Sequence, residues 1–395
     1  MDADVLIAGG GPVGLYLAAA LLQEGVTVRV FEQRQAANRH TRAIGIHPPA
    51  LEALAGVQVA SSMVHEGVRI RAGMAVSGGR TMGTMVFDHV SRDFPFVLAL
   101  PQFRTEQLLE ERVLALDPGA ILRGARVTGV TDDGGRVTAA VEAGPGATRP
   151  CGSATGALLV AADGARSVLR ERLGVPVARR TYPDHYLMGD FEDGTEYGDK
   201  AVLFLEPDGI VESFPLPGGV RRWVVRLDSP AGAAAGPHDL AELVRRRTGN
   251  QPDPASNSML SAFSVRSGIA QRTVAGRAVL LGDAAHEISP IGGQGMNLGW
   301  LGARDLVPLV CAALSGKPMG LQLRKFERNR RRAARVARRQ AEINMMLGRP
   351  LPQPLLRFRV AGIGAAAAIP AVNRWAAKRF TMQWEVSGAE GGYRK

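Results

Sequence analysis

The chain has 395 residues, 46% of them hydrophobic, which is enough for one large or two modest domains; its 48 Lys and Arg against 37 Asp and Glu give a net charge of +11. No apolar run reaches the length of a membrane span, because the longest weakly polar segment, Ala361 to Val372, has 12 residues and contains Pro370. Two distant cysteines, Cys151 and Cys311, suggest neither a metal site nor a disulfide framework, so a reducing cytoplasm is the default expectation.

The first predicted element is a buried parallel strand, Asp4 to Ala8, followed by a glycine-rich turn and a helix that runs to Glu24. In the turn, Gly9 permits a tight bend, Gly11 lets the backbone approach a pyrophosphate, and Gly14 allows close packing of helix on strand. The free N–H groups at the start of the helix favour phosphate.

A second strand, Val26 to Glu32, completes this unit. Glu32 lies 18 residues after Gly14, where a carboxylate can accept hydrogen bonds from a ribose diol. Strand, glycines, helix and acid together favour a dinucleotide site over a glycine turn without a ligand. No leader is expected before it.

The middle of the chain alternates between strand and helix patterns. Thr105 is a candidate N-cap for a helix that opens at residues 101–106. The expected elements are a helix at Ala50 to Leu54, strands at Val68 to Arg71 and Phe96 to Leu100, a helix to Leu116, and strands at Ile121 to Val130 and Arg136 to Val141.

A buried strand, Ala157 to Ala162, then ends at Asp163-Gly164, where Asp163 could simply cap the short helix that follows. From Tyr182 to about Phe263 short alternating strands predict an antiparallel sheet with room for a ligand. The expected strands are Ala201 to Leu205, Ile210 to Phe214 and Arg222 to Leu227, with a helix at His238 to Arg247.

Parallel-strand character returns at Arg277 to Asp283, and it places Asp283 at a strand's carboxyl end, where open α/β sheets contact ligands. The glycines of residues 292–295 allow the backbone to approach a flat ligand ahead of the next helix.

A long basic helix, Met319 to Leu347, follows. It suggests either nucleic-acid binding or a solvated basic face, and the second is favoured because no recognition motif accompanies it. Residues Leu355 to Phe380 mix apolar and basic side chains, which suggests either an interfacial membrane helix or, in preference, packing over the nucleotide domain.

Three motifs occur in a specific order: Gly9-x-Gly11-x-x-Gly14, Asp163-Gly164-Ala165-x-Ser167-x-x-Arg170, and Gly282-Asp283-Ala284-Ala285-His286 with Pro290 and Gly293-Gln294-Gly295-x-Asn297. Through them residues 1 to about 340 resemble the group A FAD-dependent aromatic hydroxylases, the para-hydroxybenzoate hydroxylase-like flavoprotein monooxygenases. The chain looks most like the bacterial aromatic polyketide hydroxylases. Many of these carry a C-terminal thioredoxin-like domain, which is expected to be missing because only about 50 residues follow Leu347.

The resemblance implies an α/β fold: a Rossmann-like FAD-binding domain with an inserted antiparallel-sheet substrate domain and C-terminal helices. The implied divisions are 1–175 and 269–318 for FAD, 176–268 for the substrate, and 319–395 for the basic helix and tail. The residues implied to bind cofactor are Gly9, Gly11, Pro12, Val13, Gly14, Glu32, Gln33, Arg34, Arg42, Gln102, Val127, Asp163, Gly164, Asp283, Pro290, Gly293, Gly295, Met296 and Asn297.

Several roles stay open. Arg42 matches a family arginine near the mobile flavin but could be an ordinary surface residue, and no catalytic base can be named. His47 could act in a loop or in catalysis, and His286 fits a structural histidine better than a proton shuttle. Pro49 and Gly302-Ala303 depart from the family pattern, which leaves local flavin geometry in doubt.

The implied reaction uses NADPH or NADH to reduce FAD and inserts one atom of O2 into an aromatic or polyketide-type substrate through a C4a-hydroperoxyflavin. The alternatives are a Baeyer–Villiger oxygenase, a prenyl or quinone reductase, and a non-catalytic flavin-binding module. A halogenase is disfavoured because Trp223-Val224-Val225 lacks the expected signature. The expected partners are a small aromatic substrate and O2, with no metal, no nucleic acid and no stable membrane insertion, in a cytoplasmic monomer or homodimer.

Overall fold

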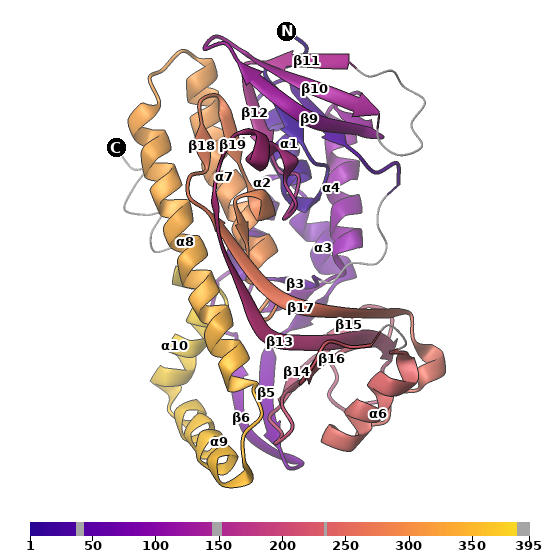
Figure 1. Cartoon of the computed structure of the whole chain (residues 1–395). Coiled ribbons are helices and arrows are strands. Elements are labelled where there is room, and N and C mark those ends of the chain that lie inside the picture. The colour runs from indigo at the N-terminus through magenta and orange to yellow at the C-terminus, as the bar shows by residue number, and fades with distance from the viewer. Residues whose placement is uncertain (37–42, 144–151, 233–234, 385–395) are drawn as a thin grey trace.

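The computed structural model describes residues 1–36, 43–143, 152–232 and 235–384. Two large sheets organise these residues, one in the upper and one in the lower part of Figure 1. Neighbouring strands of the upper sheet are parallel, except at its β18 edge. Its strand order is β18 (Val274–Ala275), β19 (Ala278–Leu280), β12 (Leu158–Ala161), β1 (Val5–Ala8), β2 (Val28–Glu32) and β8 (Ile121–Arg123).

Alternate side chains of β1 enter two different cores. Val5 and Ile7 pack with helices α1 (Pro12–Gln23), α4 (Gln102–Leu116) and α7 (Gln294–Leu314). Leu6 and Ala8 pack instead toward a three-stranded sheet made by β9 (Ala125–Asp132), β10 (Val137–Ala143) and β11 (Gly152–Gly156). Because both faces of β1 are covered, every position in it is apolar.

The lower sheet has eight strands and is antiparallel apart from the β14–β5 pair. Its two longest strands, β13 and β17, extend between the upper and lower parts of the molecule (Figure 1). Its order is β20 (His286–Glu287), β17 (Met259–Ala270), β13 (Val177–Glu192), β16 (Val220–Leu227), β15 (Val211–Leu216), β14 (Ala201–Phe204), β5 (Ala72–Ser77) and β6 (Arg80–Val86).

A small antiparallel sheet completes the strand structure, with the order β3 (Gly45–Ile46), β7 (Val97–Ala99) and β4 (Val68–Ile70). The remaining helices are α2 (Pro48–Gly56), α3 (Ala60–Glu66), α5 (Val168–Arg172), α6 (Pro237–Thr248), α8 (Gly320–Leu347), α9 (Gln353–Ala368) and α10 (Pro370–Phe380), with 3₁₀ turns η1 (Pro254–Ser256) and η2 (Gly282–Ala284).

The predicted fold class is confirmed, two local expectations are corrected, and one hairpin was not foreseen. Thr105 is not the N-cap of α4; Pro101 is, and the Thr105 hydroxyl donates to the Pro101 carbonyl one turn back. The single strand expected at Ile121 to Val130 is two strands, β8 and β9, which turn at Gly124 and join different sheets. The hairpin β5–β6 was not predicted, although it lies within 1–175 and extends the lower sheet.

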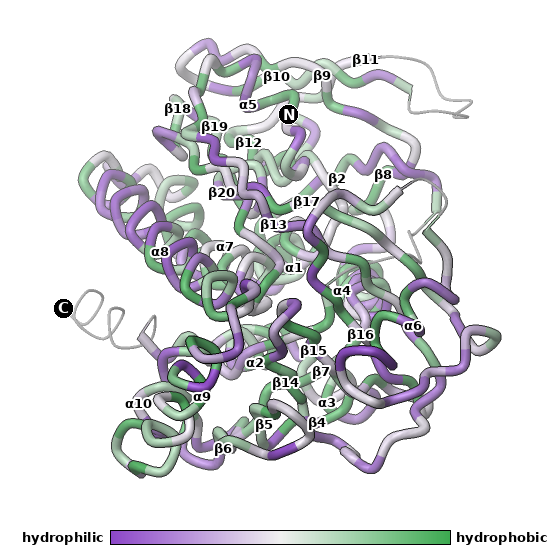
Figure 2. Tube along the Cα trace, turned by 60° about the horizontal axis from the view of Figure 1, so that its bottom comes forward, coloured by the Kyte–Doolittle hydropathy of each residue, from purple (hydrophilic) through white to green (hydrophobic). Residues whose placement is uncertain are grey.

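The basic helix α8 is amphipathic. Small residues, among them Ala333, Ala337 and Ala341, are buried in the core shared with α7, while arginines such as Arg332 and Arg335 are exposed. Figure 2 shows the resulting alternation of hydrophilic and hydrophobic positions along α8. Arg330 is the exception, because its side chain is buried and forms a 2.9 Å ion pair with Asp305.

The C-terminal helices α9 and α10 pack against β6 of the lower sheet. The end of α10 also contacts the nucleotide domain, where the Gln294 amide donates to the Phe380 carbonyl at 3.3 Å, so the expected packing over that domain is found in part. The Asn373 amide donates to the Thr84 carbonyl of β6 at 2.7 Å, and Gly364 lies against the Met82 carbonyl. Within the described part of the chain, no single helix is long and apolar enough to cross a membrane; α9 and α10 pass such a test only together, across a bend of 101°.

Gly14 tests how tightly α1 is packed on β1. A Cβ at this position would collide with the carbonyl oxygen of Gly9, whereas a Cβ at Gly11 would meet nothing within 4 Å. We expect Gly14→Ala to lower the free energy of unfolding by about 1–3 kcal/mol, as overpacking does. Gly11→Ala should leave it nearly unchanged. Urea denaturation of the two variants checks this, and equal stability of both would contradict the packing argument.

Candidate functional site

One cavity of about 1070 Å³ lies between the carboxyl edge of the upper sheet and the lower sheet. All but three of the residues predicted to bind cofactor line it: Gly9, Gly11, Pro12, Val13, Glu32, Gln33, Arg34, Gln102, Val127, Asp163, Gly164, Asp283, Pro290, Gly293, Gly295 and Met296. Strands distant in the chain therefore bring the three glycine-containing motifs to one wall.

The three exceptions have different explanations. Gly14 packs beneath the turn, against the backbone of Gly9. Asn297 is fully buried, and its amide donates to the carbonyls of Gly45 (3.0 Å) and Gly293 (2.7 Å). Its side chain therefore supports the wall of the cavity from behind. Arg42 lies outside the described residues.

The first glycine turn leaves one end of the cavity open to an anion. Gly9 has a φ of +108°, and an added Cβ there would collide with the Ala162 carbonyl. Gly11 faces open space, and as the N-cap of α1 it has no side chain to satisfy the N–H groups that follow. Free N–H groups and the helix dipole together attract phosphate.

Glu32 is held rigidly at the end of β2. Its Oε2 accepts from the Gly10 N–H at 2.8 Å, and its Oε1 accepts from the Arg34 backbone (2.8 Å) and Nε (2.9 Å). Burial would raise its pKa, but the hydrogen bonds from Arg34 and Gly10 outweigh that effect and the net pKa is lowered. A buried, ionised carboxylate at this place can still accept from sugar hydroxyls.

Glu106 lines the same end, and the sequence analysis did not single it out. Burial raises the pKa of its carboxyl, which lies 3.9 Å from Arg34 and accepts from the Gln102 amide at 2.7 Å. Because this bond turns the amide nitrogen of Gln102 toward Glu106, the amide oxygen is the atom left to contact a ligand. The signal available in sequence was the spacing of Gln102 and Glu106, one turn apart on α4.

Asp163 both caps a helix and meets the cavity. Its Oδ2 accepts from the Leu169 N–H at 3.2 Å, which is the capping role left open above. Its Oδ1 is buried without a hydrogen-bond partner among the described residues. Arg170 donates to the carbonyls of Ala165 (3.0 Å) and Ala284 (3.1 Å), which fastens this loop to the one that carries Asp283.

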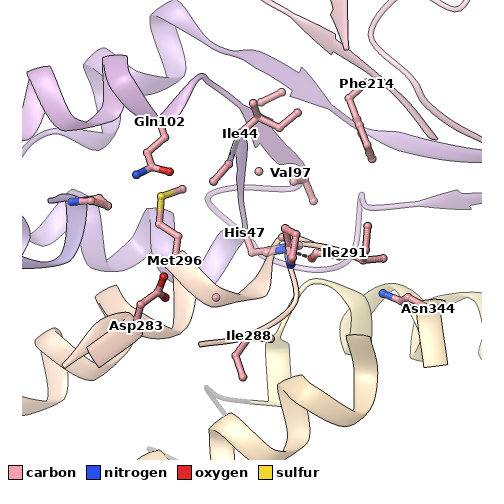
Figure 3. Close-up of a pocket in the computed structure, with 18 of the residues that line it drawn as sticks. Ile44, His47, Val97, Gln102, Phe214, Asp283, Ile288, Ile291, Met296 and Asn344 are labelled. Atoms are coloured by element: carbon pink, nitrogen blue, oxygen red, sulfur yellow. Dashed lines mark hydrogen bonds between the residues drawn. The ribbon is translucent and has the colours of Figure 1, made fainter. Parts of the chain in front are cut away.

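Asp283 follows β19. Its side chain lines the cavity and is enclosed by the protein on its other sides. Burial, with a smaller effect from Glu287, raises its pKa to about 6. Figure 3 shows Asp283, Met296 and Gln102 converging from three elements on one end of the cavity. Helix α7 begins beside them, and its N-cap, Gly293, adopts a φ of 66° and provides no side-chain cap.

His47 fixes the cavity wall and is not exposed to bulk water. Its backbone N–H donates to the Asn297 amide oxygen at 2.8 Å, its Nε2 lies 3.2 Å from the Gly292 carbonyl, and its ring meets Phe380 edge-on at 5.4 Å. Burial lowers its pKa to about 4. Because a carbonyl can only accept, Nε2 carries the proton and the ring is neutral. These bonds support the loop role for His47.

His286 does not line the cavity. It is buried on β20, where burial lowers its pKa to about 4. Among the described residues, no three His, Cys, Asp or Glu side chains are grouped so that they could hold a metal ion.

The far end of the cavity is apolar; the sequence predicted a sheet with room for a ligand here, but none of the residues that line it. It is lined by side chains from the lower sheet, α8 and α10, among them Met74, Leu203, Phe214, Val224 and Phe380. Figure 3 shows Phe214 and Asn344 on this side, away from Asp283. Glu212 and Arg222 are charged residues in the same wall.

A second, more polar cavity of about 520 Å³ adjoins the first. The two share Arg166, Phe263, Ile288 and Pro290. Arg166, Arg179 and Arg266 line the second cavity, against one acid, Glu287. This balance suits an anionic ligand.

The first cavity fits FAD on these observations. Open space at Gly11 and two helix starts without side-chain caps suit the phosphates, Glu32 suits a ribose, and Asp283 suits a polyol chain. The buried Asp163 Oδ1 that lacks a partner indicates that a donor from a ligand completes this site.

Comparison with known proteins agrees with this fit. A family model described as FAD binding domain matches residues 2–341. A rifampicin monooxygenase from Streptomyces venezuelae is 30% identical over 387 residues, which cover 96% of this chain and 78% of that protein. A 12-dehydrotetracycline 5-monooxygenase/anhydrotetracycline 6-monooxygenase from Streptomyces rimosus subsp. rimosus is 30% identical over 369 residues, 89% of this chain and 71% of that one.

Among solved structures, p-nitrophenol 4-monooxygenase from Pseudomonas putida superposes with a TM-score of 0.87 and covers 96% of this chain and 98% of its own. Its sequence identity is 23%, so this likeness shows the fold alone.

Glu32 gives a direct test of the cofactor site. We expect Glu32→Gln to weaken FAD binding about tenfold to hundredfold, because a charge-assisted hydrogen bond contributes about 1.5–3 kcal/mol. Titration of apoprotein with FAD, followed by flavin fluorescence, measures the change. Glu24→Gln, at the exposed end of α1, is the matched control. Equal FAD affinity in both variants would remove Glu32 from the site.

Proposed function

This chain belongs to the family described as FAD binding domain, and on that premise we propose that it is an FAD-dependent monooxygenase that uses NAD(P)H and O2 to oxygenate an aromatic or polyketide-type substrate. Its relatives named above are monooxygenases. The overall change consumes one O2, one NAD(P)H and one proton, and it yields the oxygenated product, NAD(P)⁺ and water.

The observation that carries the proposal is the continuity of one cavity from the glycine turns to the apolar far end. The glycine turns, Glu32, Asp163, Asp283 and the start of α7 would hold FAD. When bound, FAD supplies the electron transfer from the nicotinamide and the activation of O2. The apolar wall holds the substrate beside it and excludes water, which limits loss of reducing equivalents to hydrogen peroxide.

The adjoining cavity supports an anionic reductant such as NADPH or NADH. Arg166, Arg179 and Arg266 could bind a pyrophosphate or phosphate, while the nicotinamide reaches the flavin through the shared residues. No second dinucleotide fingerprint is needed for this transient mode of binding.

The far wall supports a large, flat, mostly apolar substrate. Phe87, Phe214, Trp375 and Phe380 line it and can pack against fused rings. The relatives' substrates, rifampicin and tetracycline intermediates, suggest a polycyclic phenol for this chain. We retain the divisions 1–175, 176–268, 269–318 and 319–395 as the proposed domains, with β5 and β6 contributing to the substrate half.

The oxygenation itself can be followed with heavy-isotope O2. The purified protein, NADPH and a panel of rifampicin, anhydrotetracycline and 1,8-dihydroxyanthraquinone would be incubated, and the products read by mass spectrometry. We expect one labelled oxygen in a ring hydroxyl. A label in a ring-expanded ester would indicate Baeyer–Villiger chemistry, and a product that gains hydrogen without label would overturn the monooxygenase proposal in favour of a reductase.

Arg266 tests the reductant site. We expect Arg266→Gln to raise KM for NADPH about tenfold, through loss of one charge-assisted contact, while FAD affinity stays the same. Arg324→Gln, on the exposed face of α8, is the control. Steady-state NADPH oxidation measures both variants. An unchanged KM in Arg266→Gln would place NADPH elsewhere.

A further inference from the structure

Strand β15 places one carboxyl in the apolar half of the cavity. Glu212 and Phe214, two residues apart on β15, both line the cavity, and Figure 3 shows the Phe214 ring on that side. The residues on either side of Glu212 face the other way: Val211 packs in the cluster around Trp223, and the Ser213 hydroxyl accepts from Arg221 at 3.1 Å. The alternation of the strand therefore points Glu212 at the substrate space.

The neighbours of Glu212 are apolar. In the sheet register it lies between Leu203 of β14 and Val224 of β16, and both of these also line the cavity. The side chain is 8% exposed, and it makes no hydrogen bond or ion pair with any described residue. A buried carboxyl without a partner is costly for the folded protein, so a structural role does not account for it.

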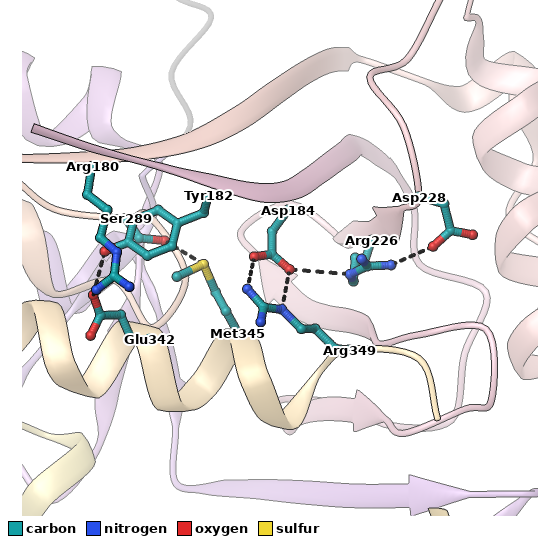
Figure 4. A network of polar contacts seen from close by, with 9 residues as sticks. All are labelled: Arg180, Tyr182, Asp184, Arg226, Asp228, Ser289, Glu342, Met345 and Arg349. Carbon is teal, nitrogen blue, oxygen red and sulfur yellow. Dashed lines mark hydrogen bonds and ion pairs between the residues drawn. The ribbon is translucent and has the colours of Figure 1, made fainter. Parts of the chain in front are cut away.

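The other charges of this sheet are paired. Arg222 holds Asp190 through two bonds of 2.6 and 2.7 Å. Asp184 is shared between Arg226 (3.4 Å) and Arg349 (2.7 Å), as Figure 4 shows. None of these arginines forms an ion pair with Glu212, whose carboxyl is left to the cavity.

Few groups around Glu212 change their protonation state near neutral pH. On β13, the Tyr186 hydroxyl has a pKa raised by burial and then by the negative charge of Glu212. Across the cavity, His47 is neutral because burial lowers its pKa to about 4, and burial raises the pKa of Asp283 to about 6. Two cations line the nearby wall: Arg379 of α10, and Arg222 of β16, which is paired with Asp190. Asp283 is thus the group whose titration must be separated from that of Glu212.

We propose that Glu212 is a catalytic residue that binds an aromatic hydroxyl of the substrate and accepts its proton during oxygen insertion. This inference rests on the proposed function and adds to it a proton acceptor for the phenol. Neither a base nor Glu212 could be named from the sequence.

The proton balance is simple. The O–H bond of the phenol breaks, its proton moves to a carboxylate oxygen of Glu212, and the electron pair remains on the phenol oxygen, which enriches the ring for attack by an electrophilic oxygen atom. After insertion, the ring carbon releases its hydrogen as a proton to solvent and the ring regains aromaticity, while the phenol oxygen takes its own proton back from Glu212. Burial raises the pKa of Glu212 to about 7, so a basic carboxylate is present at neutral pH.

Glu212→Gln keeps the shape of the side chain and removes its basicity. With 1,8-dihydroxyanthraquinone, NADPH and O2, we expect the rate of product formation to fall about 100-fold, the contribution of a general base. The rate of FAD reduction should be unchanged, so that NADPH is consumed and hydrogen peroxide accumulates. Glu206→Gln is the matched control, because burial also raises the pKa of Glu206 but its side chain does not line the cavity.

Binding gives a second readout that does not depend on turnover. With 2-naphthol, followed by its fluorescence, we expect the wild-type holoenzyme to bind about tenfold more tightly at pH 8 than at pH 6, because the ionised carboxylate is the stronger acceptor. Glu212→Gln should lose this difference, while Glu206→Gln keeps it. Because Asp283 is intact in Glu212→Gln, loss of the difference assigns it to Glu212 and not to Asp283.

Two results would overturn the proposal: a Glu212→Gln variant that matches the wild type in coupling and in pH dependence, or a wild-type protein that binds neither phenol. If the wild type shows a Glu212-dependent affinity for 2-naphthol yet incorporates no labelled oxygen into any substrate, the proposed function fails and the phenol site stands.

Discussion

The close approach of three backbone segments at the end of β1 is the constraint on which the site depends. Gly9 lies against the Ala162 carbonyl and beneath Gly14, and neither contact leaves room for a Cβ. This packing brings the carboxyl ends of β2, β12 and β19 to one edge, and with them Glu32, Asp163 and Asp283. The three acids are far apart in the chain but share one wall because the parallel sheet aligns their strands.

A second constraint joins this edge to the substrate half. Asn297 on α7 binds the backbone of residues 45, 47 and 293, and His47 in turn holds the Gly292 carbonyl and contacts Phe380. The neutral, buried imidazole of His47 therefore connects the cofactor end of the cavity to the C-terminal helices. Loss of its bonds would therefore loosen the wall between the two ends of the cavity.

The sequence predicted the cofactor end far better than the substrate end, and the reason is physical. A phosphate-binding turn is local, so the spacing of Gly9, Gly11 and Glu32 carries most of its information. The substrate wall is assembled from β5, β14, β15 and β16, and the position of Glu212 depends on its register with Leu203 and Val224. The hairpin β5–β6 contains glycines and carries weak strand character, and the packing of α9 and α10 is decided by contacts with it. The start of α4 was likewise misplaced in the sequence-based prediction, because Pro101 and not Thr105 is its N-cap.

Strands β13 and β17 extend from the cofactor end to the substrate end, and they pair on both sides of a register shift between Thr181 and His185. Opening the molecule between its two halves would break that ladder, whose bonds each contribute about 1 kcal/mol. The shared ladder therefore ties the two halves together, with one irregular point between Thr181 and His185. Helices α9 and α10 close the cavity from outside, and their Phe358 and Trp375 are exposed to solvent at 78% and 64%. A polycyclic substrate in the far end of the cavity would therefore lie between a strand sheet on one side and helices with a solvent-exposed outer face on the other.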